Sequence, residues 1–229
     1  MNKRINKILS SIENGNILHV GCTGGLLSKP EYKINTDRED KYDINLGENS
    51  LHLNLISKFG QDRVYGIDIS EEKITYFRDN LEISNLDVAS AESYSSNIKY
   101  TNIIFTEVIE HLNNPGNTLV NLSRMLDKNG QILITTPYAY SIFYPVYAWL
   151  NFPNTTQNKE HTMLFCPSTI KVLTENSGLI LDRFELISDH PTRFKNKTYK
   201  ILYFFISQIF KLFPKKIYAK TLFAIVKNK

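Results

Sequence analysis

The chain has 229 residues, of which 42% are apolar and 22% are charged, and its net charge is +4. An aromatic content of 12% excludes a disordered chain, and 10 Gly with 8 Pro exclude a collagen-like or linker-like one. The two cysteines, Cys22 and Cys166, argue against a disulfide-stapled secreted fold. The N-terminal segment holds no apolar run of signal-peptide length, so we expect a cytoplasmic protein.

The charge is divided unevenly along the chain. From His190 to Lys229 there are nine Lys, one Arg and no acid, which gives +10. Residues 1–189 keep 17 basic and 23 acidic residues, which gives −6. An acidic body with a basic, aromatic-rich tail is typical of a protein that contacts phosphate-bearing surfaces, either lipid or nucleic acid. We therefore expect a core over 1–189 and a separate basic part over 190–229.

Strand-like and helix-like runs alternate along the chain, which predicts an α/β fold with a parallel sheet covered on both faces. The seven strands are expected over 16–20, 63–67, 86–89, 102–106, 131–136, 179–187 and 221–226.

Two helices have clear sequence boundaries. One begins at Asn114-Pro115, because Pro at the first helical position loses no hydrogen bond, and is expected to stop at Asn129-Gly130. The other opens at Pro167 and closes at Gly178. Two further helices are expected over 51–59 and 71–83.

A glycine-rich turn follows the first strand directly. Its residues are Gly21, Cys22, Thr23, Gly24 and Gly25. Glycines in this position let the chain turn sharply and let a ligand approach where a Cβ would block it. The dinucleotide pattern GxGxxG is not met, which argues against a nicotinamide cofactor. A tight turn without a ligand is the alternative.

The second strand ends in an acid, Asp68, followed by Ile69 and Ser70. A carboxylate at the carboxyl end of a strand beside the first one can accept both hydroxyls of a ribose. The alternative is that Asp68 or Ser70 caps the next helix.

Six segments in this order resemble the class I S-adenosylmethionine-dependent methyltransferases. They are ILHVGCTGG, VYGIDIS, ASAES, IIFTEVIEHLNNPG, MLDKNGQILITTPY and HTMLFCPSTIKVLTENSGL, and together they cover roughly residues 16–187. The most similar subgroup comprises small methyltransferases that modify polysaccharides, lipids and sugars. The resemblance implies a doubly wound, Rossmann-like sheet of seven mostly parallel strands, with the last strand antiparallel.

Carried over by position, the resemblance places S-adenosylmethionine along the ends of the first strands. It puts the methionine part over Gly21 to Gly25, the ribose on Asp68, the adenine beside Ser90 to Glu92 and the sulfonium near Thr106 and Glu107. The implied cofactor-binding residues are His19, Gly21, Cys22, Thr23, Gly24, Gly25, Asp68, Ile69, Ser90, Ala91, Glu92, Thr106 and Glu107. The chain departs from the family pattern at His19 and Ser90, where acids are customary, and at Thr23.

Histidines supply the expected acid–base chemistry. The methyl on a sulfonium is already activated, so the protein must align the acceptor and remove a proton where one is present. His111 and His161 follow the fourth and fifth strands and are the predicted general bases, with Tyr138 as an orienting hydroxyl. His19 and His52 are expected to pack. For each of these residues a purely structural role is the alternative.

The spacing of Glu107, Glu110 and His111 raises the question of a metal. It resembles the metal site of small-RNA 3′-end 2′-O-methyltransferases, with His161 as a further ligand. The sequence EVIEHL is also common in metal-free members of the wider family, so we expect no metal. A metal-dependent RNA 2′-O-methyltransferase remains an alternative, as does an inactive cofactor-fold module that recruits partners to a membrane.

The tail contains an amphipathic pattern over 199–213 that is too short to span a bilayer. Residues 199–216 are predicted to contact an anionic membrane surface, with packing on the core as the alternative. The basic insertion over 190–215 precedes the last strand, expected within 219–229. The prediction is therefore methyl transfer to O or N of a small or lipid-linked acceptor, a sugar or glycan precursor, peripheral at the inner face of the membrane and without nucleic acid.

Overall fold

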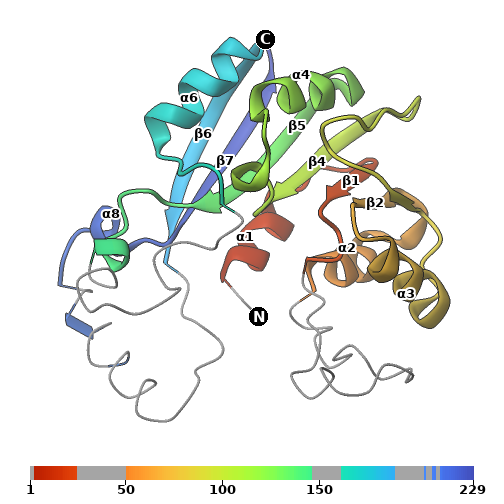
Figure 1. Cartoon of the computed structure of the whole chain (residues 1–229), viewed down its shortest axis with the longest axis horizontal. Coiled ribbons are helices and arrows are strands. Elements are labelled where there is room, and N and C mark those ends of the chain that lie inside the picture. Colours follow the sequence, from red (N-terminus) through yellow and green to blue (C-terminus); the bar gives the residue numbers. More distant parts are fainter. Residues whose placement is uncertain (1–2, 25–49, 146–160, 189–203, 205–207, 210–211) are drawn as a thin grey trace.

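The computed structural model describes residues 3–24, 50–145, 161–188, 204, 208–209 and 212–229. Seven strands form one sheet in the order β3-β2-β1-β4-β5-β7-β6 (Figure 1). They are β1 (Ile17–Val20), β2 (Val64–Asp68), β3 (Leu86–Val88), β4 (Tyr100–Thr106), β5 (Leu126–Pro137), β6 (Leu179–Ile187) and β7 (Thr221–Asn228). All neighbouring pairs are parallel except β5–β7 and β6–β7. The predicted doubly wound sheet with an antiparallel last strand is confirmed.

Helices cover both faces of the sheet. Along β4, Ile103 and Phe105 face one core cluster and Ile104 faces another, as the two-residue period of a strand requires. The first face is covered by α4 (Pro115–Met125) and α6 (Pro167–Asn176). The second face is covered by α1 (Lys3–Ser11), α2 (Leu51–Phe59) and α3 (Glu71–Leu81). Three short helical turns also lie in the described ranges: η3 (Gln61–Arg63), η4 (Ile109–His111) and α8 (Lys215–Tyr218).

Side-chain caps begin three of these helices. Ser50, Ser70 and Asn114 each accept a hydrogen bond from a backbone N–H in the first turn of α2, α3 and α4. Each cap satisfies one of the donors that a helix start leaves open. The capping role predicted as an alternative for Ser70 is thus observed.

The structure corrects one helix boundary. The prediction ended α4 at Asn129-Gly130, but the helix ends at Met125 and β5 begins at the next residue. A Cβ at Gly130 would lie 2.8 Å from the carbonyl oxygen of Tyr100. Gly130 therefore allows β5 to approach β4 at a shift in register, and is not a helix cap.

Helix α1 was missed from the sequence. Its apolar residues Ile5, Ile8 and Leu9 recur at helical spacing and are buried against β4, β5 and β7. The helix has no acid in its first turn, so the spacing of these apolar residues is the signal that could have revealed it.

The carboxyl ends of the parallel strands meet at one edge of the sheet. Pro137 of β5 and Ile187 of β6 both pair with Thr221 of β7, so these two strands end in the same row. Beside them, Thr106 of β4 pairs with Thr135. We call this row of strand ends the carboxyl edge.

The predicted core over 1–189 and insertion over 190–215 stay predictions, because most of the insertion lies outside the described residues. The last strand lies within the range predicted for it. No helix in the described ranges is long and apolar enough to cross a membrane.

Candidate active site

The carboxyl edge divides into two parts that carry different chemistry. We call the ends of β1, β2 and β3 the cofactor half, and the ends of β4, β5 and β6 the acceptor half. The side chains predicted to function in both halves follow strand ends, where an open parallel sheet binds its ligands.

In the cofactor half, the acid at the end of β2 is tied to the first loop. Asp68 Oδ2 accepts from the backbone N–H of Thr23 at 3.0 Å and from its hydroxyl at 2.7 Å, and Oδ1 accepts from Ser70 N at 3.0 Å. An ionised carboxylate offers about four lone-pair sites, of which three are filled here. Thr23, which the resemblance implied as a cofactor-binding residue and as a departure from the glycine spacing, thus holds Asp68 in place.

The glycine-rich loop also pairs with β2 through its backbone. The N–H groups of Gly21 and Cys22 both donate to Ile67 O, and Gly24 N donates to Gly21 O. Gly21 has φ +73°, and a Cβ on it would lie 2.6 Å from Val108 Cγ2. Glycine is thus required at position 21 both by the positive φ of the turn and by the close packing of Val108. The sequence predicted the turn but not the contact with Val108. Gly25 lies outside the described residues.

Apolar side chains flank Asp68 on the surface. Ile69 is 77% exposed and Val88, at the end of β3, is 45% exposed and pairs with Asp68 in the strand ladder. Exposed apolar groups beside a fixed carboxylate suit a ligand with a flat apolar ring and a hydroxylated sugar. Ile69 was predicted; Val88 was not, although it is the last residue of an apolar strand.

The turn after β3 links the two halves. Glu92 Oε1 accepts from the backbone N–H groups of Asn113 and Asn114 at 3.0 and 3.1 Å, at the start of α4. Ser90 Oγ accepts from Glu92 N at 3.3 Å, and Ala91 is buried. The Glu92 carboxylate at a helix start is favoured by the helix dipole, which gives it a structural role beside the predicted contact with adenine.

The buried pair of His19 and His52 lies inside the fold. Their Nδ1 atoms are 3.3 Å apart and their rings are stacked. Burial, and next the charge of His52, lower the pKa of His19, and burial lowers the pKa of His52 to about 4. Both rings are therefore neutral near pH 7, as packing residues should be. Contact of His19 with a cofactor stays a prediction.

In the acceptor half, Glu107 follows β4 in a strained conformation. Its φ is +53°, a region that non-glycine residues rarely adopt. Its backbone N–H donates to Thr135 O at 2.8 Å, while Oε1 accepts from Thr135 Oγ1 at 3.0 Å and pairs with Arg4 of α1 at 3.2 Å. Helix α1 thus reaches the carboxyl edge and neutralises this acid. Thr106, the last residue of β4, is half-buried beside it.

Next to Glu107 lies a cluster of one acid and two histidines. The ligand-type atoms of Glu110, His111 and His161 lie within 4.8 Å of one another. The two imidazole rings are in edge-to-face contact, with centroids 4.7 Å apart. His161 is held there because Thr162 donates its N–H and its hydroxyl to Glu110 O. The predicted meeting of His111 and His161 at this edge is observed, whereas Glu107 is turned toward Arg4.

Glu110 is the buried member of this cluster, with 1% exposure. Its Oε2 accepts from Thr136 Oγ1 at 3.0 Å, while Oε1 has no hydrogen-bond partner and lies 4.0 Å from His161 Nε2. Burial, and next the charge of Glu107, raise the pKa of Glu110 to about 8. Glu110 is therefore mostly protonated near pH 7.

Two tyrosines follow β5. Tyr138, the predicted orienting hydroxyl, is buried, and its N–H donates to Lys220 O. Burial, and next the charges of Glu107 and Glu110, raise the pKa of Tyr144 to about 12. The charges of both acids thus act on the Tyr144 hydroxyl. No sequence signal distinguished it, because its distance from them depends on the path of the chain after β5.

Comparison with known proteins gives the family. The family model described as a methyltransferase domain matches residues 1–182. The chain belongs to this family. Over 137 residues the chain is 28% identical to a ubiquinone biosynthesis O-methyltransferase of Pelagibacter ubique (strain HTCC1062). The matched region covers 57% of this chain and 46% of that protein. The match spans about half the length of that curated relative.

Solved structures share the fold of this methyltransferase-domain protein. An S-adenosylmethionine-dependent methyltransferase from Archaeoglobus fulgidus is similar over 99% of this chain and 91% of its own, with TM-score 0.62 and 16% identity. Magnesium protoporphyrin IX methyltransferase from Synechocystis PCC 6803 was solved with bound S-adenosylhomocysteine. It is similar over 99% of this chain and 83% of its own, with TM-score 0.59 and 12% identity. The fold is therefore that of S-adenosylmethionine-dependent methyltransferases.

Proposed function

We propose that this protein transfers a methyl group from S-adenosylmethionine to an oxygen or nitrogen of a small or lipid-linked acceptor, such as a sugar or glycan precursor. The observation that carries the proposal is the single carboxyl edge. It holds Asp68 in the cofactor half and the pair of His111 and His161 in the acceptor half. Bound cofactor supplies an activated methyl group on its sulfonium.

The residues of the cofactor half fit S-adenosylmethionine. Asp68 is held by Thr23 and Ser70 and keeps a lone pair on Oδ1 for a ribose hydroxyl. Ile69 and Val88 offer exposed apolar surface for the adenine. A second ribose hydroxyl must replace the Thr23 hydroxyl on Oδ2, because both lone pairs of that oxygen are in use.

The acceptor half supplies a base. Histidine is the side chain that most often serves as a general base, so His111 or His161 can remove a proton from a hydroxyl or ammonium as the methyl arrives. Glu110, buried beside them and mostly protonated near pH 7, adds little negative charge to the pair. The ubiquinone biosynthesis O-methyltransferase among the relatives supports an acceptor oxygen on a lipid-soluble molecule.

The experiment is methyl transfer from labelled S-adenosylmethionine into glycan, lipid and quinone-precursor fractions. We expect label in one fraction, and its loss in Asp68→Ala. A chain that binds S-adenosylhomocysteine but labels no fraction would instead support the inactive, partner-recruiting module.

A second candidate is a metal-dependent methyltransferase, the class to which an RNA 2′-O-methyltransferase belongs. The observation that favours it is the convergence of Glu110, His111 and His161, with a buried Glu110 oxygen that has no hydrogen-bond donor. Imidazole and carboxylate ligands suit Mn²⁺ or Zn²⁺ better than Mg²⁺. Activity that chelation abolishes and Mn²⁺ restores would support it; unchanged activity would exclude it.

Peripheral attachment to an anionic membrane is part of the proposal. Most of the segment 199–216 lies outside the described residues, but Ile209, Leu212 and Phe213 are exposed apolar side chains beside its lysines, Leu212 at 84%. Sedimentation with anionic vesicles that rising salt reverses would support attachment.

A further inference from the structure

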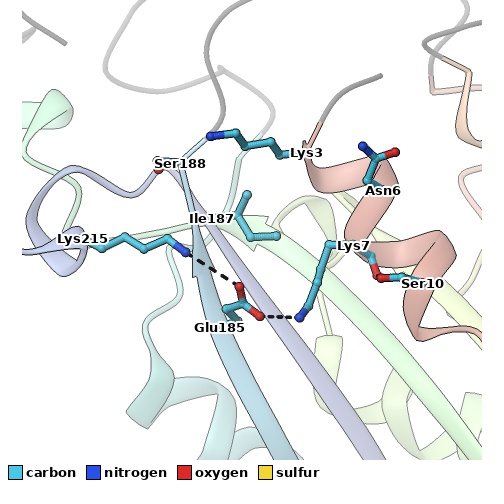
Figure 2. Close-up of a pocket in the computed structure, with 8 residues that line it drawn as sticks. All are labelled: Lys3, Asn6, Lys7, Ser10, Glu185, Ile187, Ser188 and Lys215. Carbon is cyan, nitrogen blue, oxygen red and sulfur yellow. Dashed lines mark hydrogen bonds and ion pairs between the residues drawn. The ribbon is translucent and has the colours of Figure 1, made fainter. Parts of the chain in front are cut away.

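A cavity of about 370 Å³ opens between α1 and the end of β6, outside the cluster of Glu110, His111 and His161 (Figure 2). Its volume lies within the range of small-molecule sites. Figure 2 shows Lys3 and Lys7 from α1, Lys215 from α8 and Glu185 from β6 around it. Three lysines from two separate helices thus surround one hollow, which we call the lysine pocket.

The lysine pocket carries excess positive charge. Glu185 Oε2 lies 2.5 Å from Lys7 Nζ, and Oε1 lies 3.8 Å from Lys215 Nζ. Among the residues that the structure describes, no acid pairs with Lys3. Three positive charges against one negative leave a net charge of +2. No Asp or Glu follows Asp189 in the sequence, so the charged side chains beyond that residue are all positive.

Packing fixes the direction of the lysines. The apolar face of α1 is buried in the core, and Lys7 Nζ lies 5.7 Å from the centre of the Phe223 ring. Lys3 and Lys7, four residues apart, share one helix face. The side chain of Lys7 is only 32% exposed, so its charge is less screened than that of a fully solvated lysine. Glu185 holds Lys7 and Lys215 in position while leaving each ammonium further N–H donors.

The lysine pocket lies on the carboxyl edge, in line with the acceptor half. Glu185 pairs with Phe223, which pairs with Thr135, which pairs with Thr106, so all four lie in one row across the sheet. Three strand spacings put Glu185 about 14 Å from Thr106. Helix α1 joins the two places, because Arg4 contacts Glu107 and the adjacent Lys3 lines the lysine pocket.

We propose that the lysine pocket binds the phosphate or pyrophosphate group of the methyl acceptor, while the acceptor's reacting atom lies near Glu107 and His111. This rests on the proposed function. A phosphate monoester carries a charge of about −1.5 to −2, which complements a net +2 better than the single charge of a carboxylate does. The acceptor class is then a phosphorylated sugar or a lipid-linked pyrophosphate, with its phosphate about 14 Å from the methylated atom.

The test is titration calorimetry of the full chain with inorganic pyrophosphate at low salt. Hydrogen bonds to charged groups are worth about tenfold in affinity or more each, so Lys3→Gln with Lys7→Gln should weaken binding at least about tenfold. Lys3→Arg with Lys7→Arg keeps the charge and should restore most of it. The matched control is Lys128→Gln, an exposed lysine at the opposite end of β5, which should bind as wild type does.

A second arm distinguishes the source of the phosphate. Binding to phosphatidylglycerol vesicles that pyrophosphate displaces would indicate a lipid-carried group. Binding of pyrophosphate without vesicle binding would indicate a free phosphorylated acceptor. The proposal is overturned if wild type ignores pyrophosphate, or if the double Gln variant binds it equally well.

S-adenosylhomocysteine binding, measured in the same samples, separates the two proposals. Normal binding of this product with no pyrophosphate binding rejects the lysine pocket and leaves methyl transfer intact. Lysine-dependent pyrophosphate binding without methyl transfer to any fraction rejects the proposed function and keeps the pocket as an anion site. A double Gln variant that unfolds shows in its circular dichroism, and the single variants Lys3→Gln and Lys7→Gln are then compared with Lys128→Gln.

Discussion

The cofactor half and the acceptor half of the carboxyl edge differ in how their polar groups are satisfied. In the cofactor half Asp68 and Glu92 are each held by two or more hydrogen bonds, and apolar side chains are exposed beside Asp68. In the acceptor half Glu107 is strained and Glu110 has a buried oxygen without a donor. The polar groups of the first half are therefore held in place without a ligand, as expected if this half binds the cofactor. The second half contains a strained backbone at Glu107 and a buried carboxyl oxygen without a hydrogen bond, features that are common at reactive sites.

The largest effect is expected from the acceptor half. His111→Ala or His161→Ala should lower turnover by about 10² to 10⁴ while S-adenosylhomocysteine affinity stays unchanged, because a general base acts only on the acceptor proton. Steady-state kinetics on the fraction that takes up label measure turnover, and calorimetry measures the affinity as the control. Full activity in both variants would leave alignment alone as the mechanism.

Stability should depend on pH through Glu110. Its pKa is raised in the folded protein, so its stabilising contribution is complete below the ordinary value of 4.5 and is lost as pH rises to about 8. At about 1.4 kcal/mol for each unit of pKa, the loss amounts to a few kcal/mol.

Glu110→Gln stays neutral at every pH and should remove most of this dependence. Urea unfolding of chelator-treated protein at pH 5 and pH 8 measures it. An equal fall in stability for wild type and Glu110→Gln would assign the pH dependence to other groups.

In the cofactor half, Asp68→Ala should weaken S-adenosylhomocysteine binding about ten- to a hundredfold, because charge-assisted hydrogen bonds to the ribose are lost. The matched control is Asp62→Ala, an exposed acid at the amino end of β2. Unchanged affinity in a folded Asp68→Ala protein would reject the ribose assignment.

The smallest effect is expected at Thr23. Thr23→Val removes the hydroxyl that occupies Asp68 Oδ2 and keeps the backbone N–H bond. One lone pair becomes open to the ribose, so affinity should rise a few-fold. Thr23→Ser retains the hydroxyl and should bind as wild type does. Weaker binding in Thr23→Val would mean that the hydroxyl serves to orient the acid.

Gly21→Val would not isolate the contact with the cofactor that the resemblance implies for Gly21. The new side chain would meet Val108 and a positive φ before it met any ligand. Loss of binding in that variant would report on the loop itself, so it does not test the cofactor assignment.

The sequence by itself determined the fold class and the strand ends that carry chemistry. Strand periodicity, capping residues and glycines are local signals, and they predicted β6 within its observed bounds and the starts of α2, α3, α4 and α6. They also predicted Asp68, His111 and His161 at one edge, because parallel strands bring their carboxyl ends together.

Only the tertiary structure decided which groups meet across that edge. Arg4 neutralises Glu107 from a helix about a hundred residues earlier in the chain, and Thr23 reaches Asp68 from the neighbouring strand end. Lys3, Lys7 and Lys215 surround one cavity although they come from opposite ends of the sequence. Such contacts depend on how the buried faces of separate elements pack together. The period of apolar residues, two in a strand and 3.6 in a helix, specifies which face of an element is buried, but it does not specify which other element covers that face.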